Sequence, residues 1–169
     1  MAEHLPEFID PLALADKGRQ FKGSLPLSKM TRLQDLLADG QGEAGFVLRF
    51  GRDGKVATVT GVVEAELALQ CQCCLGAIPW PVHCQVSLGV VRSLAEADLL
   101  PESYEPLLLE EDSMPLADIV QEELLLALPA IPQHEVCEPA AQAAPIEEIK
   151  SPEVPKRPNP FAVLATLKQ

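Results

Sequence analysis

Hydrophobic and polar residues alternate along much of the first half of the chain, which is the pattern of β-strands that bury one face. Around residues 46–50 every second position is apolar, and Asp53-Gly54 follows at once as a hairpin signal. Two longer alternating runs come next, at 63–71 and 80–90, and the loop 72–79 joins them. We expect these runs to pair as antiparallel strands of one sheet with one wet face.

A second pattern, with the 3.6-residue period of a helix, occurs twice. The earlier segment, 29–39, follows Ser28 as a candidate N-cap and ends at Asp39-Gly40. Its apolar face would contain Met30, Leu33, Leu36 and Leu37. This predicts a short N-terminal helix.

The later helical segment covers residues 115–128 and is the longest regular element that the pattern predicts. Asp112 or Ser113 would cap it, and Pro115 suits its first turn. The predicted buried stripe consists of Leu116, Ile119, Val120, Leu124, Ala127 and Leu128. Asp118, Gln121 and Glu122 are predicted to face solvent.

The remaining segments are less regular. Residues 1–25 read as an extended lead-in, and 104–110 as a further strand that is broken at Pro106. Six prolines occur from Pro139 to Pro160, which is typical of a linker. We therefore predict a single α+β domain over 1–137, a Pro-rich linker over 138–158 and a short apolar C-terminal segment over 159–169.

Composition supports a domain of ordinary size. The chain has 169 residues, 47% of them hydrophobic but only 4% aromatic, so its core must consist mainly of Leu, Val and Ala. The predicted fold class is α+β: a mainly antiparallel sheet, one long packed helix, a short N-terminal helix and a Pro-rich C-terminal tail.

Charge is distributed unevenly. The formal net charge is −12, yet residues 1–60 hold eight basic and eight acidic side chains. Between Ser93 and Ile149 there are fourteen Asp or Glu residues and no Lys or Arg. This segment, residues 93–149, is called the acidic half below. It repels phosphate backbones and anionic membranes and attracts basic partners.

The sequence has no basic and apolar leader at its start and no run that approaches a membrane span, so we expect a cytoplasmic protein. In a reducing compartment its five cysteines favour thiols or metal ligands over disulfides.

One set of these residues has the spacing of metal ligands. Cys71-x-x-Cys74 ends one predicted strand, and His134-x-x-Cys137 follows the long helix. Two such pairs can close a tetrahedral zinc site, because each spacing lets both side chains reach one ion. The alternative is a group of loop thiols beside a solvated histidine.

Other chemical interpretations of these residues are weaker. A thioredoxin-like role needs Cys-x-x-Cys at a helix N-terminus, whereas this pair lies between two predicted strands. Cys84 falls on an apolar strand face and is predicted to be a core thiol, while His83 points to the polar face. Glu122-Glu123 does not share one helix face, which argues against an acid–base pair. Without a nucleotide loop or a nucleophile elbow, nothing indicates an enzyme.

Four segments together are similar to one known family. They are Glu66–Leu75, Leu100–Pro106, Glu122–His134 and Pro158–Leu164, the last reading Pro-Asn-Pro-Phe-Ala-Val-Leu. In order and spacing they resemble the YceD family, the large ribosomal RNA subunit accumulation proteins, and the last segment resembles the proteobacterial branch. This chain has Cys73 where a basic residue is usual, so Cys73 is either a substitute ligand or a loop thiol.

The resemblance implies a non-enzymatic factor in ribosome biogenesis that supports synthesis, processing or stability of the large-subunit (23S) ribosomal RNA. Because the acidic half is poorly suited to RNA, we expect it to bind a basic ribosomal protein or assembly factor. RNA would then be affected indirectly or through small basic patches. The candidate partner-binding residues are Asp118, Glu122, Glu123, Phe161 and Leu164.

The alternative function is a zinc- or thiol-dependent enzyme that acts on RNA. It would use the same candidate metal ligands, which are Cys71, Cys74, His134 and Cys137. Metal content and activity of the purified protein toward RNA distinguish the two hypotheses.

Overall fold

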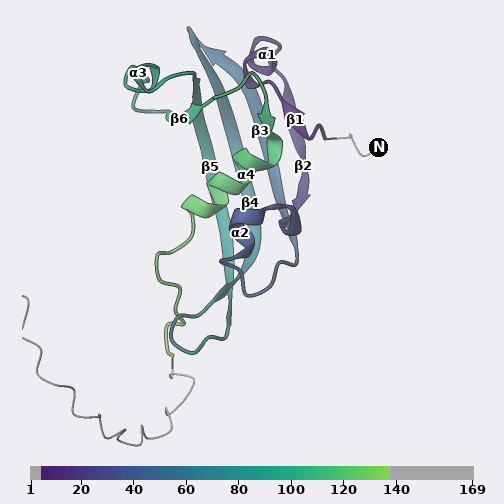
Figure 1. The fold of residues 1–169 in the computed structure, drawn as a ribbon, viewed down its shortest axis with the longest axis vertical. Coiled ribbons are helices and arrows are strands. Elements are labelled where there is room, and N and C mark those ends of the chain that lie inside the picture. Colours follow the sequence, from purple (N-terminus) through teal and green to yellow (C-terminus); the bar gives the residue numbers. More distant parts are fainter. Residues whose placement is uncertain (1–4, 138–169) are drawn as a thin grey trace, which may run out of the picture. The chain divides into compact units, whose positions relative to one another are not determined.

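The computed structural model describes residues 5–137, which lie within one compact unit. Its centre is a five-stranded sheet of order β2-β3-β4-β5-β6 (Figure 1). The strands are β2 (Gln20–Pro26), β3 (Glu43–Asp53), β4 (Val56–Gln70), β5 (Ala77–Val91) and β6 (Glu105–Leu108). The predicted linker 138–158, the predicted segment 159–169 and the candidates Phe161 and Leu164 lie outside the described residues.

Strands β2, β3, β4 and β5 pair antiparallel with their neighbours. The alternation predicted the strands β3, β4 and β5 but not β2. A two-residue turn joins β3 to β4, and its first residue, Gly54, has φ +58°. This is the arrangement in which glycine is favoured at the first turn position. The predicted hairpin is therefore confirmed, as is the pairing of the two long runs across a short loop.

Strand β6 pairs parallel to the edge of β5, with Leu88 opposite Glu105 and Val90 opposite Leu107. The predicted break at Pro106 is wrong, because Pro106 lies inside this strand. Its missing N–H is tolerated at the edge of a sheet, where one side of the strand needs no partner. The sheet is thus mainly antiparallel with one parallel edge strand.

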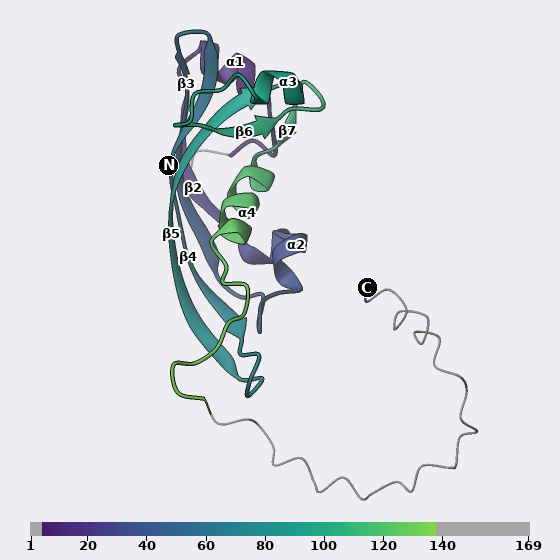
Figure 2. The same ribbon diagram turned by 90° about the vertical axis from the view of Figure 1, so that its left-hand side faces the viewer.

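Two helices cover one face of the sheet, α2 (Thr31–Gln34) and α4 (Leu116–Leu126), and Figure 2 shows both on the same side. The alternating apolar residues of the strands point into the layer between sheet and helices. The largest fully buried side chains are Phe50, Leu27, Met30, Leu33, Leu48, Leu67, Leu69, Leu116, Ile119, Leu124, Val59 and Val63. The α+β class is confirmed. None of the helices in residues 5–137 could cross a membrane.

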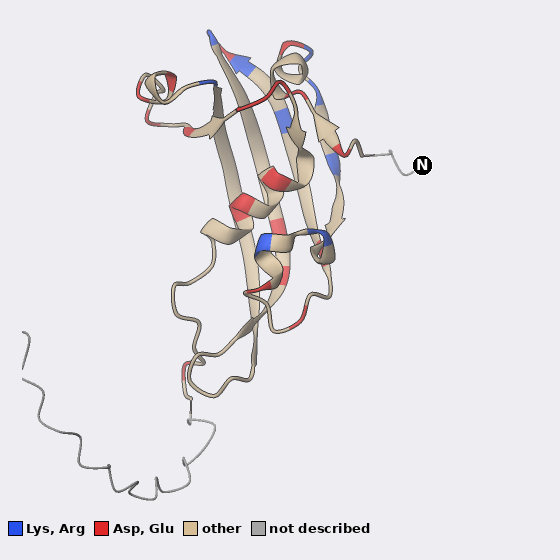
Figure 3. Ribbon diagram, in the orientation of Figure 1, with Lys and Arg blue, Asp and Glu red and all other residues tan. Residues whose placement is uncertain are grey.

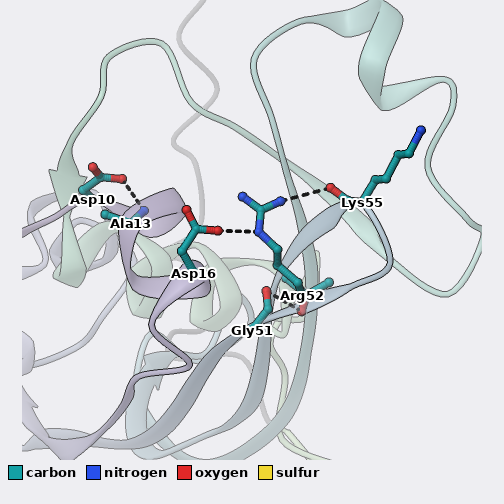
Figure 4. Close-up of polar contacts among 7 residues, drawn as sticks. Asp10, Ala13, Asp16, Gly51, Arg52 and Lys55 are labelled. Carbon is teal, nitrogen blue, oxygen red and sulfur yellow. Dashed lines mark hydrogen bonds and ion pairs between the residues drawn. The ribbon is translucent and has the colours of Figure 1, made fainter.

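The interpretation of residues 1–25 as an extended lead-in is wrong. This part of the chain contains the edge strand β2, a two-residue strand β1 (Phe8–Ile9) and a helix α1 (Pro11–Asp16). The Asp10 side chain caps α1 by accepting a bond from the Ala13 N–H at 2.9 Å. Figure 4 shows the other end of α1 tied to the β3–β4 hairpin, where Arg52 Nε lies 2.5 Å from Asp16 Oδ1.

The predicted helix 29–39 is shorter than expected. A 3₁₀ turn, η1 (Leu27–Lys29), precedes α2, and α2 ends at Gln34. Beyond that point the chain pairs with the end of β4, because Ala38 N–H donates to Ala68 O at 2.6 Å and Leu37 bridges Leu69. A backbone engaged in strand-like pairing cannot continue a helix.

The long helix is also shorter than predicted, and its cap differs. Residues Met114–Pro115 form strand β7, which pairs with β1, so the helix begins only at Leu116. Asp112 does not cap it but pairs with Arg92 at 2.7 Å. A last short helix, α3 (Leu94–Ala97), precedes β6.

The prediction that Gln121 faces solvent is wrong. Gln121 is buried, and its Oε1 accepts a hydrogen bond from the Arg32 backbone N–H at 3.2 Å. The first N–H groups of a helix have no partner within the helix, so the Gln121 amide supplies one for the start of α2. This bond links the two helices on the covered face.

Candidate metal centre and acidic surface

The loop between β4 and β5 folds back tightly on itself. Cys71 N–H donates to Gly76 O at 2.8 Å, and Leu75 N–H donates to Cys71 O at 2.9 Å. Leu75 has φ +59°, which non-glycine residues rarely adopt. A Cβ on Gly76 would lie 3.4 Å from Cys74 Sγ, so Gly76 lies directly beside that thiol. The loop therefore places Cys71 and Cys74 side by side.

The segment after α4 runs back to this loop. Gln72 N–H donates to Pro132 O at 2.9 Å, which fixes the segment against the loop backbone. Two side-chain contacts follow: His134 Nδ1 lies 3.4 Å from Cys74 Sγ, and Cys137 Sγ lies 3.5 Å from Cys71 Sγ. The sulfur–sulfur distance is far longer than the roughly 2.05 Å of a disulfide.

The four candidate ligands form one cluster. The ligand atoms of Cys71, Cys74, His134 and Cys137 all lie within 4.8 Å of one another. In a tetrahedral zinc site the bond lengths separate neighbouring donor atoms by about 3.6–3.8 Å. Two of the donor pairs are already near that separation. The cluster could hold a metal ion, as the two sequence pairs predicted.

The electrostatics of the loop favour a thiolate at Cys71. Burial alone would raise the pKa of the Cys71 thiol, but hydrogen bonds from backbone N–H groups of Cys74, His134 and Cys73 and from the Cys137 side chain lower it to about 5. The thiolate, not the thiol, is the form that binds metals. For Cys137 the hydrogen bond with Cys73, burial and the nearby thiols raise the pKa. A bound cation would favour the ionised form of both the Cys71 and the Cys137 thiol.

The other cysteines lie outside this cluster. The Cys73 thiol faces the Cys137 carbonyl at 3.9 Å, and the Cys73 N–H donates to Cys71 Sγ. Cys73 thus supports a ligand without being part of the four-atom group. Cys84 packs against the core, as predicted, and burial with the Glu123 charge raises its pKa.

The acidic residues of the second half gather around α4. Figure 3 shows Asp and Glu along α4, in α3 and in the segment that leads into α4. Of the nine Lys and Arg residues within 5–137, four lie on β2, on β3 or in the β3–β4 turn. Of the predicted partner-binding residues, Asp118 and Glu122 are exposed. Glu122 pairs with Arg32 at 2.5 Å, which neutralises part of its charge.

Glu123 differs from its neighbours. It is only 8% exposed, so it offers little area to a flat partner surface. Burial raises the pKa of its carboxyl, and the charges of Glu105 and Glu122 raise it further. Glu105 was not a predicted site residue, because the parallel pairing that brings β6 beside α4 leaves no local signal in the sequence.

The chain is similar to proteins of a known family. The family described as "Large ribosomal RNA subunit accumulation protein YceD" matches residues 59–168 of this chain, which include α4 and the whole Cys/His cluster. A protein of that name from Haemophilus influenzae is 34% identical over 98% of this chain and 97% of its own length. No solved structure matches the chain significantly.

Proposed function

The chain belongs to the YceD family of large ribosomal RNA subunit accumulation proteins, and on that basis we propose that it supports the accumulation of large-subunit ribosomal RNA as a non-enzymatic binding factor. The observation that supports this most is the near full-length similarity to a protein of that name. Its place of action would be the cytoplasm, where bacterial ribosomes are assembled.

The proposed mode of action is binding of a basic ribosomal protein or assembly factor through the surface around α4. Exposed Asp118 and Glu122 belong to the segment 93–149, which has fourteen acidic residues and no basic ones. Non-specific affinity for RNA comes from Lys and Arg, so this surface is ill suited to RNA and well suited to a cationic protein. The effect on ribosomal RNA would then pass through that partner.

We assign zinc to the Cys/His cluster. Three thiols and one imidazole fill a tetrahedral zinc site completely, which is the donor set of a structural rather than a catalytic ion. The ion would hold the segment 130–137 against the β4–β5 loop and so fix the end of α4. This role agrees with a factor that acts by binding.

A deletion strain tests the function. We expect fewer large subunits on a sucrose gradient and more precursor 23S RNA, with recovery when the wild-type chain is supplied. Normal subunit levels in the deletion strain would refute the proposal. Cleavage or modification of ribosomal RNA by the purified protein alone would instead favour an enzyme.

The acidic surface is tested by a charge-matched pair of variants. Asp118→Asn with Glu122→Gln removes two negative charges from α4, whereas Glu64→Gln with Glu66→Gln removes two exposed ones from the opposite face of the sheet. We expect only the first pair to lose a basic ribosomal partner in pulldowns, and moderate salt to weaken the wild-type complex. Equal losses would show that net charge alone decides binding.

Zinc is tested by metal analysis of freshly purified protein. We expect one zinc ion per chain in the wild type, none in Cys71→Ser and a full complement in Cys84→Ser, whose thiol contacts the Glu123 carbonyl instead. A wild-type protein without stoichiometric zinc would contradict the assignment.

A further inference from the structure

A pocket of about 330 Å³ opens between the edge strand β6 and helix α4. Apolar and acidic side chains share its wall: Leu88, Glu105, Pro106, Leu107, Ile119, Glu122, Glu123 and Leu126. The pocket is separate from the Cys/His cluster, which lies at the β4–β5 loop. The two elements that form the pocket, β6 and α4, both belong to the acidic half.

Glu123 is the unusual residue of this pocket. Only 8% of the residue is exposed, and its carboxylate, whose oxygens keep some contact with solvent, has no hydrogen bond or ion pair within residues 5–137. Burial raises the pKa of the Glu123 carboxyl, and the like charges of Glu105 and Glu122 raise it further. A half-desolvated carboxylate beside two like charges is stabilised in its ionised form when a cation joins it.

The shape and chemistry of the wall indicate which cation fits. Leucine, isoleucine and proline side chains suit an aliphatic stem, and the carboxylates suit a charged head at its end. Arginine matches best, because its planar guanidinium has five N–H donors for several carboxylates and is less strongly hydrated than an ammonium group. The volume accommodates one such side chain.

The neighbouring strand indicates how such a side chain would arrive. β6 ends the sheet, and on its outer side it pairs with no other strand of the described part of the chain. An extended segment of a partner can add to a free edge, with alternate side chains directed into pockets beneath it. Glu105 and Leu107 face the helix side, where the pocket lies.

We infer that the β6–α4 pocket receives one arginine side chain from an extended basic segment of the partner protein. This inference rests on the proposed function and names the chemistry by which the acidic surface recognises its partner. Glu123 would supply the carboxylate that the arginine neutralises, with Glu105 and Glu122 at the pocket mouth.

The test uses the full chain and short peptides. The probe is acetyl-Gly-Val-Arg-Val-Gly-amide, with citrulline or lysine in place of arginine as its counterparts, titrated by two-dimensional NMR. We expect the arginine peptide to shift the amides of Leu107, Ile119 and Glu123, the lysine peptide to bind more weakly, and the citrulline peptide to cause no shift. Equal binding of the citrulline peptide, tighter binding of the lysine peptide, or shifts that map elsewhere would overturn the inference.

A matched pair of variants separates this pocket from general electrostatics. Glu123→Gln and Glu111→Gln each remove one negative charge from the acidic half, but Glu111 is exposed and lies outside the pocket. We expect Glu123→Gln to weaken binding of the arginine peptide at least tenfold without lowering the melting temperature of the protein. We expect Glu111→Gln to weaken this binding less than twofold. Equal effects would refute the assigned pocket. If Glu123→Gln still captures the ribosomal partner while the Asp118/Glu122 variant does not, the pocket assignment fails and the proposed function stands.

Discussion

The backbones of two central strands leave no room for a side chain at Gly61, and replacing this residue by alanine is the sharpest test of the fold. Gly61 lies in β4 opposite Leu48 of β3. A Cβ built there would lie 1.9 Å from Val47 O, 2.9 Å from Val47 C and 3.1 Å from Leu48 Cα. Because the obstructing atoms belong to the backbone, no side-chain rotation relieves the overlap.

The magnitude follows from this distance. Cβ atoms essentially never approach another heavy atom within 3.0 Å, so β3 and β4 must separate by about 1.1 Å at this point. N–H···O bonds tolerate only about 0.5 Å of variation, so the two or three nearest bonds are lost at about 0.5–1.5 kcal/mol each. Displacement of fully buried Leu48 and Val63 adds to this. We expect Gly61→Ala to lose about 3–5 kcal/mol of unfolding free energy.

Gly51→Ala is the matched control for this experiment. Gly51 lies in the adjacent strand β3, and a Cβ there would meet only Thr58 Oγ1, at 3.9 Å. This is ordinary contact, so we expect a change within about 1 kcal/mol. Urea unfolding followed by circular dichroism measures both variants. A Gly61→Ala protein as stable as Gly51→Ala would refute the strand geometry described here.

Three further predictions concern the packing of α4. Leu124→Ala should cost about 2–5 kcal/mol in urea unfolding because Leu124 is fully buried, whereas Leu126→Ala, 66% exposed, should change stability by less than about 1 kcal/mol. Gln121→Ala should cost about 1–3 kcal/mol, because the Arg32 N–H loses its acceptor, and faster hydrogen exchange of that amide would identify the cause. For Glu123 the folded-state pKa is raised, so ionisation costs stability as pH rises above the ordinary value of about 4.3. Glu123→Gln should therefore be more stable than the wild type at pH 7, and the difference should vanish below about pH 4; a gap that is independent of pH would contradict this.

Local patterns were sufficient for several parts of this protein. The alternation at 46–50, 63–71 and 80–90 predicted paired strands, because each residue's side depends only on its position along its own strand. Asp53-Gly54 predicted the hairpin for an equally local reason. The candidate metal cluster could also be predicted from the sequence, since two ligand pairs at x-x spacing leave few ways for four residues to surround one ion.

Other features could not be predicted from local patterns, because they depend on contacts between segments that are distant in the sequence. Helix α2 stops at Gln34 because the following residues pair with the end of β4, and no residue in 29–39 signals that pairing. Pro106 lies within a strand because β6 is at the sheet edge, and a parallel partner cannot be recognised from four residues.

By itself the sequence determined the antiparallel strands, the acidic half, the ligand pairs and the family resemblance. Only the tertiary structure decided the environments of Gln121 and Glu123, which look like exposed helix residues in the sequence but are buried. The reason is that a helix placed between a sheet and a second helix has more than one buried side, whereas its hydrophobic period reveals only the most apolar one. The extra buried sides hold one polar side chain that bonds to α2 and one carboxylate that opens into the β6–α4 pocket.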